Sequence, residues 1–304
     1  MTQYIHAVPN FSEGRRKEVI ESVVGVFRNT PGVKLIDYFP DADFNRTVIE
    51  VIGQPEPLKE ALLKMAGESI RLINMEEHSG SHPRIGAQDT IPIFPLKNIT
   101  LDECIILAER IGRAVYDLYK VPIFFSGENA RTTERKSLDY IRAGQYEGLK
   151  KVAHQPERAP DIGPAALHPR AGAVIVSAGE SGLVAFNVIL GTPDVSIAKS
   201  IAKIVRGPSG GFSTVRAVGL KFEERNQVAV SMNMFDYVKT PLYRTYELVK
   251  LEAARYGVPV VGTELIGTLP QEALVNSLEY FLQLENFKRD QILENNLIAS
   301  DLED

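Results

Sequence analysis

The sequence lacks several features that would place it in common protein classes. It holds a single cysteine, Cys104, so no disulfide can form within the chain. It has no run of about 18 apolar residues, the length that a membrane-spanning helix needs. Its N-terminal stretch also lacks the apolar core of a secretory signal. We therefore expect a cytoplasmic protein that is not embedded in a membrane.

Positive charge is also in short supply. The 304 residues include 34 lysines and arginines against 39 aspartates and glutamates, which gives a formal net charge of −5. Proteins that bind nucleic acid usually carry a basic balance or a basic stripe, so we expect no nucleic-acid partner. A local basic pocket for a small anion is compatible with this charge balance.

Common catalytic signatures are absent as well. No GxSxG elbow surrounds a serine, and residues 207–211 lack the GK[ST] of a phosphate-binding loop. His78 and His82 have the spacing of zinc ligands on a helix, but there is no HExxH pattern. Pro83 also disfavours a helix at His82. We therefore expect no metal site.

Both halves of the chain show the same order of expected elements. In the first half, apolar patterns favour strands at residues 4–8, 33–39, 47–52, 90–94 and 121–125, and helices after Ser12 and at residues 55–73 and 101–119. Ser12 is of the type that caps a helix N-terminus. In the second half, strands are expected at residues 183–190, 215–222, 227–234 and 258–265, and helices at residues 194–206 and 241–256.

This repeated order, β-α-β-β-α-β, is that of the ferredoxin-like fold. The length of the chain likewise favours two domains. We predict an α+β protein of two ferredoxin-like (βαββαβ) subdomains, residues 1–180 and residues 181–304, packed around a cleft or tunnel.

A segment rich in proline and glycine follows the elements of the first half. It covers residues 159–172 and includes Pro160, Pro164 and Pro169. Because proline fixes φ and removes a backbone donor, this segment should be extended and fairly rigid. Two interpretations stay open: a plain linker between the domains, or the lining of a ligand cleft between them.

The stretch of residues 78–95 carries the main candidates for chemistry. His82 suits proton transfer near neutral pH, Arg84 can grip a carboxylate in a fork geometry, and Asp89 can orient an imidazole or a cationic amidine. Functional side chains often lie on loops anchored by rigid elements. The alternative is that His82 is structural and that Arg84 and Asp89 simply pair with each other.

A second polar loop holds Asp41, Asp43, Asn45 and Arg46. Closely spaced acids suggest cation binding, but the loop lacks the glycine and the distal glutamate of a calcium-binding loop. The alternative is a solvated turn.

With these residues in view, the chain resembles the formiminotransferase family, the transferase part of formiminotransferase-cyclodeaminase. The motifs that carry the resemblance are VPNFSEG at 8–14, NRTV at 45–48, HPRIGAQD at 82–89, DIGP at 161–164, AFN at 185–187, VSMN at 230–233 with Asp236-Tyr237, and VVG at 260–262 followed by Gly267 and Pro270. Several long motifs in the right order, from about residue 3 to residue 280, make the resemblance specific.

The resemblance implies transfer of a formimino group between N-formimino-L-glutamate and tetrahydrofolate, a step of histidine degradation. Tetrahydrofolate would be a co-substrate, and no metal is required. The family fold implied is two ferredoxin-like subdomains with a folate tunnel between them. A homodimer is implied as well.

The resemblance also implies which residues form the site. His82 matches the catalytic histidine of the family. The folate-binding segment of the family matches Gly163, Pro164, Ala165, Ala166, Leu167, His168, Pro169, Arg170, Ala171 and Gly172. Because Gly163 and Gly172 lack a Cβ atom, we expect the backbone to approach a flat ring closely there.

The residue types suit this reaction. The attacking amine must lose a proton and the departing amine must gain one, and a single histidine can do both in turn. Carboxylates could stabilise cationic nitrogens of the intermediate, and arginines could hold the substrate carboxylates. The candidates are Asp41, Asp43 and Asp89 for the first role and Arg46, Arg84 and Arg131 for the second.

Two other functions stay open at this point. A glutamate formyltransferase could use the same scaffold, because the sequence does not separate a formyl oxygen from a formimino nitrogen. A non-catalytic folate-binding protein is the other alternative, although binding alone would not need a histidine at position 82.

Overall fold

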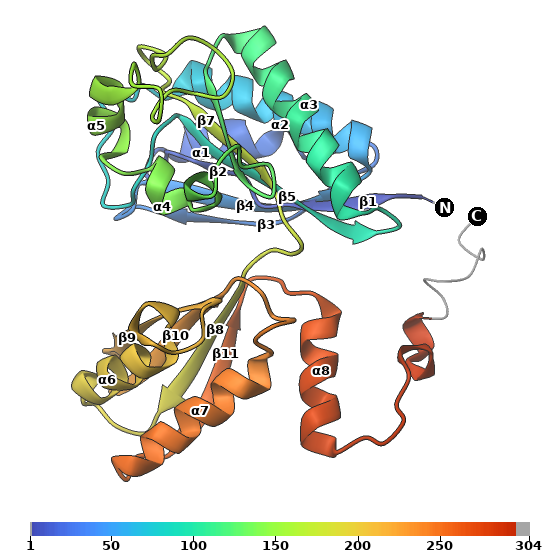
Figure 1. Ribbon diagram of the computed structural model, residues 1–304, viewed down its shortest axis with the longest axis vertical. Helices are drawn as coiled ribbons and strands as arrows, with labels where there is room; N and C mark the ends of the chain where they lie inside the picture. The colour runs from blue at the N-terminus through green and yellow to red at the C-terminus, as the bar shows by residue number, and fades with distance from the viewer. Residues whose placement is uncertain (1, 296–304) are drawn as a thin grey trace. The chain divides into compact units, whose positions relative to one another are not determined.

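The computed structural model describes residues 2–295 and divides the chain into two compact units, Met1–Glu180 and Ser181–Asp304 (Figure 1). Each unit combines helices with a β-sheet and has its own buried apolar core. The predicted class, an α+β protein with two subdomains, is confirmed. Among the described residues, none of the helices is both long enough and apolar enough to span a bilayer.

The first unit is built on a mixed sheet. Its strands are β1 (Tyr4–Ala7), β2 (Asn10–Phe11), β3 (Val33–Asp41), β4 (Arg46–Gly53), β5 (Gln88–Lys97), β6 (Ile123–Gly127) and β7 (Val174–Ala178). Its helices are α1 (Lys17–Gly25), α2 (Pro55–Leu72), α3 (Leu101–Tyr119), α4 (Leu138–Ile141) and α5 (Gln145–Val152), with a 3-10 turn at Glu134–Lys136.

The hydrogen-bond pairing of the strands gives their order in this sheet. β1 and β2 both lie between β4 and β5, so they act as one interrupted strand. β3 pairs with the far side of β4, which makes this part of the sheet antiparallel in the order β5-β1-β4-β3. On the other side of β5, β7 and then β6 extend the sheet in parallel.

Helices α1, α2 and α3 cover one face of this sheet (Figure 1). On α3, Leu107, Ile111 and Val115 recur every four residues and are almost completely buried, as the helical period requires. Each such side chain stabilises the fold by about 1.5–3 kcal/mol relative to an exposed one. A capping box starts α3, because Thr100 and Glu103 each accept the other's backbone N–H.

The second unit contains the predicted β-α-β-β-α-β order. Its elements are β8 (Val184–Leu190), α6 (Val195–Val205), β9 (Val215–Phe222), β10 (Gln227–Met234), α7 (Leu242–Arg255) and β11 (Val260–Ile266), followed by α8 (Gln271–Leu282), with 3-10 turns at Gly207–Ser209 and Arg289–Gln291. The strands form an antiparallel sheet in the order β11-β8-β10-β9. Asp194 caps α6 by accepting the Ser196 N–H at 2.8 Å.

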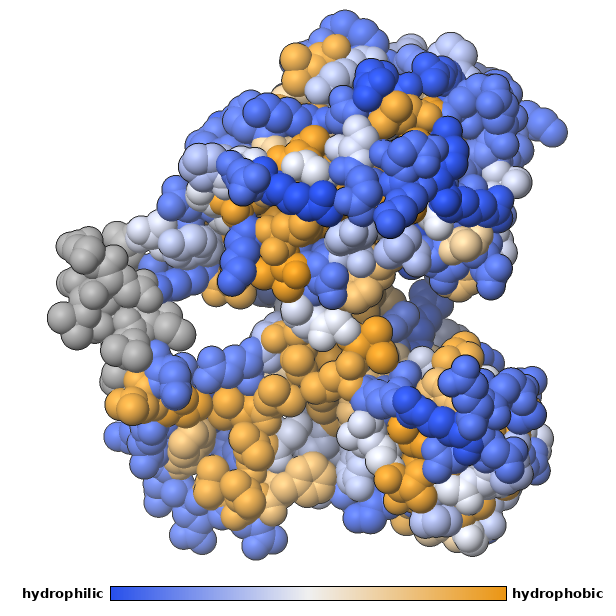
Figure 2. Space-filling view, turned by 180° about the vertical axis from the view of Figure 1, so that it is seen from behind, coloured by the Kyte–Doolittle hydropathy of each residue, from blue (hydrophilic) through white to orange (hydrophobic). Residues whose placement is uncertain are grey.

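Apolar side chains gather on the surface of the second unit, seen from behind in Figure 2. Helix α8 contributes several of them: Leu274, Leu278, Phe281 and Leu282. Each of these four side chains is at least 41% exposed, which is more apolar surface than a helix covered by its own unit would show.

Helix α1 begins later than the sequence suggests. Ser12 is not its N-cap, because the Ser12 hydroxyl donates to the Gly86 carbonyl at 2.7 Å and the helix starts only at Lys17. Phe11, just before it, still pairs with β4 and β5. Ser12 therefore ties the N-terminal strand to the loop before β5 instead of opening a helix.

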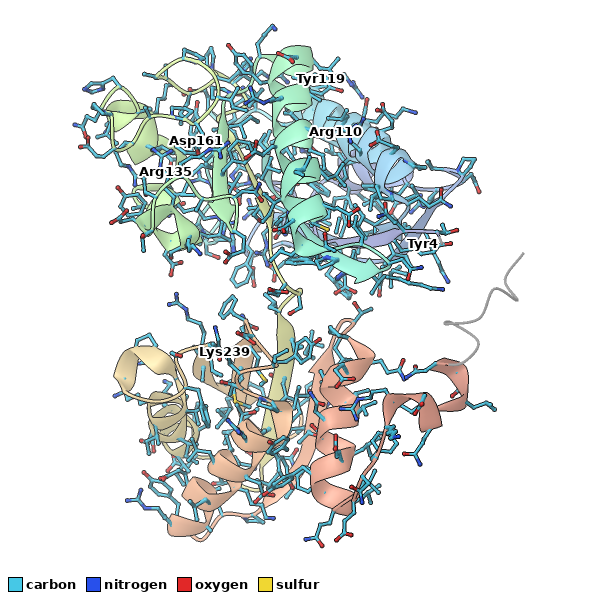
Figure 3. All side chains as sticks on the ribbon, turned by 45° about the vertical axis from the view of Figure 1, so that its right-hand side comes forward. Tyr4, Arg110, Tyr119, Arg135, Asp161 and Lys239 are labelled. Atoms are coloured by element: carbon cyan, nitrogen blue, oxygen red, sulfur yellow. The ribbon has the colours of Figure 1, made fainter. Side chains whose placement is uncertain are left out.

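The proline-rich segment, residues 159–172, lies inside the first unit and is not a linker between the units. Asp161 anchors its start by accepting the Phe125 N–H at 2.7 Å and the Arg135 Nη1–H at 2.5 Å. Figure 3 labels Arg135 and Asp161, which come from different stretches of the same unit. After the anchor, the segment leads directly into β7, a strand that the sequence did not predict.

The end of this segment offers a test of the packing. Gly172 has φ +74°, and a Cβ atom there would lie 2.0 Å from the Ile85 carbonyl oxygen. Gly172→Ala should therefore lower the free energy of unfolding by at least about 1–3 kcal/mol, the cost of a strained backbone at one residue. Urea unfolding followed by circular dichroism measures the change.

Gly148→Ala is the matched control, because a Cβ at Gly148 of α5 would meet nothing within 4 Å. That variant should gain about 0.5–1 kcal/mol, since alanine suits a helix better than glycine. Equal effects of the two substitutions would show that the approach of Gly172 to Ile85 is not a constraint.

Candidate functional site

His82 lies in the loop between α2 and β5, residues 73–87, which we call the His82 loop. This loop packs against the β3–β4 turn, residues 42–45. Gly80 permits the approach, because a Cβ atom there would lie 2.3 Å from the Phe44 carbonyl oxygen. The Ser81 N–H and hydroxyl both point to the Asp43 carbonyl, at 3.3 and 3.1 Å. The two polar loops that the sequence offers separately therefore form one structure.

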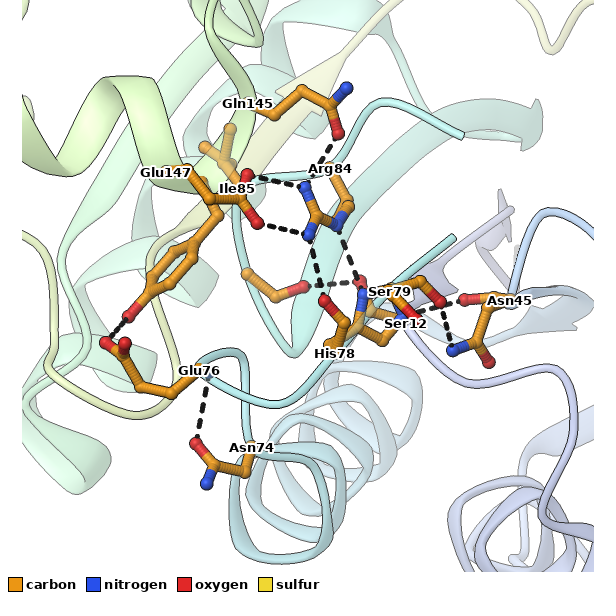
Figure 4. Close-up of polar contacts among 12 residues, drawn as sticks. Ser12, Asn45, Asn74, Glu76, His78, Ser79, Arg84, Ile85, Gln145 and Glu147 are labelled. Atoms are coloured by element: carbon orange, nitrogen blue, oxygen red, sulfur yellow. Dashed lines mark hydrogen bonds and ion pairs between the residues drawn. The ribbon is translucent and has the colours of Figure 1, made fainter. Parts of the chain in front are cut away.

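Asn45 connects the parts of this structure (Figure 4). Its side-chain oxygen accepts the Gly14 N–H at 2.9 Å, and its side-chain nitrogen donates to the Ser79 carbonyl at 2.8 Å. Its own carbonyl is 3.0 Å from His78 Nε2. Asn45 has φ +49°, a conformation that asparagine tolerates better than most residues. Asn45, the first residue of the NRTV motif, thus has a structural role.

His78 is a structural histidine. Arg84 Nε donates to His78 Nδ1 at 3.1 Å, so Nε2 carries the hydrogen that the Asn45 carbonyl accepts. Burial lowers the pKa of His78, in keeping with a neutral ring. Within residues 2–295, no group of three or more histidine, cysteine, aspartate or glutamate side chains is arranged to hold a metal ion.

Arg84 is 6% exposed and pairs with Glu147 of α5 rather than with Asp89. Its two terminal nitrogens meet the Glu147 carboxylate at 2.6 and 2.9 Å. The remaining guanidinium hydrogens point to the Gln145 side chain at 2.7 Å and to Nδ1 and the carbonyl of His78, both at 3.1 Å (Figure 4). Because every N–H has an acceptor, Arg84 holds the His82 loop on α5.

The His82 ring faces an arginine. Arg46, the first residue of β4, places Nη1 2.7 Å from His82 Nε2. Arginine only donates, so Nε2 accepts and the hydrogen of the neutral ring is on Nδ1. His82 Nδ1 is buried and has no hydrogen-bond partner. The centre of the Phe44 ring lies 5.7 Å from the centre of the His82 ring and 5.8 Å from the guanidinium carbon of Arg46.

Positive charge surrounds His82. Burial, then Arg46 and Arg142, lower the pKa of His82 to about 4, and Asp89 opposes them. Arg142 directly follows α4, and its Nη2 donates to Asp89 Oδ2 at 2.5 Å. The other Asp89 oxygen accepts the Ile85 N–H at 2.7 Å. At neutral pH the site therefore holds an uncharged imidazole between two guanidinium groups.

The other aspartates of the expected site differ in their surroundings. Asp41 accepts the Phe44 N–H at 2.7 Å and shapes the β3–β4 turn. Burial and Arg142 lower the pKa of Arg46, and the charge of Asp41, with that of Asp89, opposes this change. Asp43 is exposed and contributes its carbonyl to the contact with Ser81. Asp89 is 1% exposed and acts on His82 by its charge.

Arg131 does not join this cluster. It follows β6 and pairs with Glu109 of α3 at 2.9 Å, with its guanidinium carbon 4.8 Å from the centre of the Phe125 ring. Of the three arginines expected to hold carboxylates, only Arg46 contacts His82.

The expected folate segment runs beside the His82 loop. The Ala171 carbonyl accepts the Ala87 N–H at 2.9 Å, and the Arg170 carbonyl accepts the Met75 N–H at 2.8 Å. His168 Nδ1 accepts the Ala171 N–H at 2.9 Å, which closes a turn within the segment. Residues 163–166 are exposed. The segment thus has one edge fixed by the loop and one edge open to solvent.

The two glycines of this segment have a packing role that the sequence did not indicate. Gly163 has φ +105°, and a Cβ atom there would lie 2.8 Å from the Tyr116 ring. At Gly172 a Cβ atom would meet the Ile85 carbonyl. Both glycines are needed by the packing of the chain on itself.

Sequence reasoning missed Arg142, Glu147 and Phe44. The first two lie in the stretch IRAGQYEG, which has no motif and no clear period. Phe44 stands among the acids of the second polar loop. A buried arginine needs an acidic partner, so Arg84 implies that one exists. It does not indicate that this partner is Glu147.

Two family models together match nearly the whole chain. The model "Formiminotransferase domain, N-terminal subdomain" matches residues 4–179, and the model "Formiminotransferase domain" matches residues 185–301.

Curated relatives give the same picture. A glutamate formimidoyltransferase from Streptococcus pyogenes serotype M1 is 41% identical over 300 residues, which cover 98% of this chain and 100% of that protein. One from Thermoplasma acidophilum is 37% identical and covers 96% of this chain and 97% of its own length. A formimidoyltransferase-cyclodeaminase from Gallus gallus is 39% identical over 94% of this chain, which spans 53% of that protein.

The Arg84 network leads to a stability prediction. Glu147→Ala removes the acid that neutralises a buried guanidinium, and a buried donor left unpaired costs about 1–3 kcal/mol. The variant should unfold at a lower urea concentration. Glu128→Ala is the control, because Glu128 and Lys136 form an ion pair in which both side chains are well exposed and which should contribute little. Equal midpoints for the two variants would contradict the role given to Glu147.

The arginines around His82 lead to a pH prediction. The pKa of His82 is lowered to about 4 in the folded chain, whereas an unperturbed histidine titrates near about 6.5. The unfolded chain therefore binds more protons between these values, and His82 should make the fold less stable as pH falls through that window. Histidine-selective ¹³C NMR should show His82 neutral down to about pH 5. Arg46→Gln should raise its pKa, and a wild-type midpoint near 6.5 would refute this account.

Proposed function

The chain belongs to the formiminotransferase family, and we propose that it transfers a formimino group between N-formimino-L-glutamate and tetrahydrofolate, with His82 moving the proton. The observation that carries the assignment of His82 is its neutral imidazole. The lone pair on Nε2 accepts a hydrogen bond from the side chain of Arg46, which can be replaced by a substrate proton donor. In this role the enzyme would act in histidine degradation.

Proton movement at Nε2 gives a balanced sequence. The secondary amine of the folate ring attacks the formimino carbon and forms a carbon–nitrogen bond. Its proton passes to His82 Nε2 once Arg46 gives up that position. The tetrahedral intermediate then breaks its bond to the glutamate nitrogen, which takes the proton back from His82. One imidazole is thus first a base and then an acid.

The charged neighbours of His82 take supporting roles in this proposal. Arg46 is the arginine best placed to receive a substrate carboxylate, because Arg84 and Arg131 already have acidic partners. Asp89 and Asp41 balance the charge around the reacting nitrogens. No metal is invoked in this sequence.

We also propose that tetrahydrofolate lies along residues 163–172. What supports this is the exposed edge of the segment, residues 163–166, together with its backbone contacts to the loop that carries His82. The ring would lie over residues 164–166 of this exposed edge, because Tyr116 and the Ile85 carbonyl occupy the Cβ positions of Gly163 and Gly172.

Two further proposals concern the setting of the enzyme. We propose a homodimer, for which the exposed apolar side chains of α8 supply surface of the kind that interfaces bury. We also propose a cytoplasmic enzyme that works on small molecules, without nucleic-acid or membrane partners, in line with the single cysteine and the acidic charge balance.

His82→Ala tests the proposal directly. Loss of a general acid–base group should slow transfer by about 10²–10⁴-fold, and the fold should be kept because His82 lies in a loop. The assay mixes the enzyme with tetrahydrofolate and N-formimino-glutamate and follows the folate product by absorbance. N-formyl-glutamate in a parallel assay separates the formyl from the formimino reaction.

His154→Ala is the control, because His154 is exposed in the same unit. It should keep full activity. Wild-type turnover in His82→Ala would refute the assignment of His82, and product from N-formyl-glutamate alone would replace the formimino reaction by the formyl reaction. Absence of any product from wild-type enzyme with either donor would support the non-catalytic alternative.

A further inference from the structure

His82 and two arginines near it are half-buried, and each has a buried polar atom without a hydrogen-bond partner in the described part of the chain. Arg46 Nε, Arg142 Nε and His82 Nδ1 are all buried, and none of them has a hydrogen-bond partner. Buried polar atoms of this kind are normally paired, because an unmade hydrogen bond there is costly. Two of the three belong to guanidinium groups, which can only donate. The cluster therefore lacks an acceptor.

The charge of the cluster points the same way. Burial and then the charge of Arg142 lower the pKa of Arg46, and the charges of Asp89 and Asp41 oppose this change. Asp89 is itself paired with Arg142. His82 adds no negative charge. An arginine pair that is partly desolvated and only partly neutralised favours an anion with two acceptor oxygens.

We propose that Arg142 and Arg46 together form one site for a carboxylate of the glutamate substrate, and that its occupancy draws Arg46 away from His82 Nε2. The inference rests on the proposed function and deepens it. Arg142 would touch substrate, and Asp89 would be its positioning residue.

The anchoring of Arg142 suits this role. Asp89 fixes Arg142 Nη2 and is itself fixed by the Ile85 N–H of the His82 loop. Arg142 Nε–H is left without an acceptor, so it is available to a ligand oxygen. Among the described residues, no carboxylate is bonded to Arg46, whose contacts are His82 Nε2 and the face of the Phe44 ring. No ion pair therefore has to break for Arg46 to turn toward an anion. Arg142 is thus the fixed half of the site and Arg46 the mobile half.

Substrate binding would then prepare the base. While Arg46 donates to Nε2, the lone pair that must take the proton is occupied. A carboxylate that binds both guanidinium groups frees this lone pair and neutralises the charges that hold the pKa of His82 down. The imidazole becomes a useful base only when the glutamate substrate is in place, and a compound without a carboxylate should not activate it.

The test is a titration of His82 in the full chain by histidine-selective ¹³C NMR. The chain has five histidines, so the spectrum is simple, and His82→Ala assigns the signal. Saturating glutamate should raise the His82 midpoint by about one pH unit or more, a tenfold change in proton affinity. Sodium chloride at equal ionic strength should leave the His82 midpoint unchanged. No midpoint change with glutamate would overturn the proposal.

The source of the carboxylate is separated by a second arm. Folate also carries carboxylates, so the titration is repeated with folate in place of glutamate. A response to glutamate supports the proposal. A response to folate alone would overturn the assignment of this site to the glutamate substrate.

Variants of Arg142 complete the test. Arg142→Gln should abolish most of the glutamate-induced shift and raise KM for N-formimino-glutamate by about 10–100-fold, the loss of a charged hydrogen bond, with KM for tetrahydrofolate little changed. Arg142→Lys should recover part of both effects. Arg113→Gln, on the exposed side of α3, is the matched control and should behave as wild type. A wild-type KM in Arg142→Gln would overturn the proposal.

Two safeguards keep the outcomes distinct. If Arg142→Gln unfolds because Asp89 is left buried and unpaired, the double variant Asp89→Asn/Arg142→Gln removes both charges and takes its place. The titration needs no turnover. A glutamate-induced shift without transfer would refute the proposed function and keep this site, whereas transfer without a shift would refute the site and keep the function.

Discussion

The neutralisation of buried arginine charge governs the architecture around His82. Arg84 is buried in the first unit, and a buried guanidinium without partners would be costly. It is paired with Glu147 and donates to Nδ1 and to the carbonyl of His78. Through these contacts the loop between α2 and β5 is held on α5. In the same way, the ion pair between Arg135 and Asp161 holds the start of the proline-rich segment in place. Two ion pairs thus fix the two irregular stretches that lie side by side in the site.

Arg46 departs from this pattern, and the departure gives the site its chemistry. Arg84, Arg135 and Arg142 each bond a carboxylate, whereas Arg46 bonds a neutral ring. An arginine bonded to imidazole suppresses protonation of that ring and is easily exchanged for a better acceptor. The charge of Arg46 therefore disfavours protonation of His82, and in the proposal made above the same charge would receive the substrate carboxylate.

Much of the fold was accessible from the sequence, and much of the site was not. Apolar periodicity and turn residues mark α2, α3, β8 and the β9–β10 hairpin, because local pattern and tertiary burial agree there. Ser12 misled because its hydroxyl found a partner in Gly86, far along the chain. A motif singles out His82 as a candidate, but Arg142 and Glu147 lie in a stretch whose only signal is the charge they balance. Partners of that kind are chosen by three-dimensional proximity, which no local pattern encodes.

The bonds that shape the site join distant parts of the chain. Ser12 meets Gly86 across 74 residues, Arg84 meets Glu147 across 63, Arg142 meets Asp89 across 53 and Arg46 meets His82 across 36. Contacts of such high sequence separation form late, since loop closure must be paid before they are gained. In an incompletely folded chain, Arg46 and Arg142 are therefore not yet held beside His82. If the proposed site is correct, binding of the glutamate substrate would report that the first unit has finished folding.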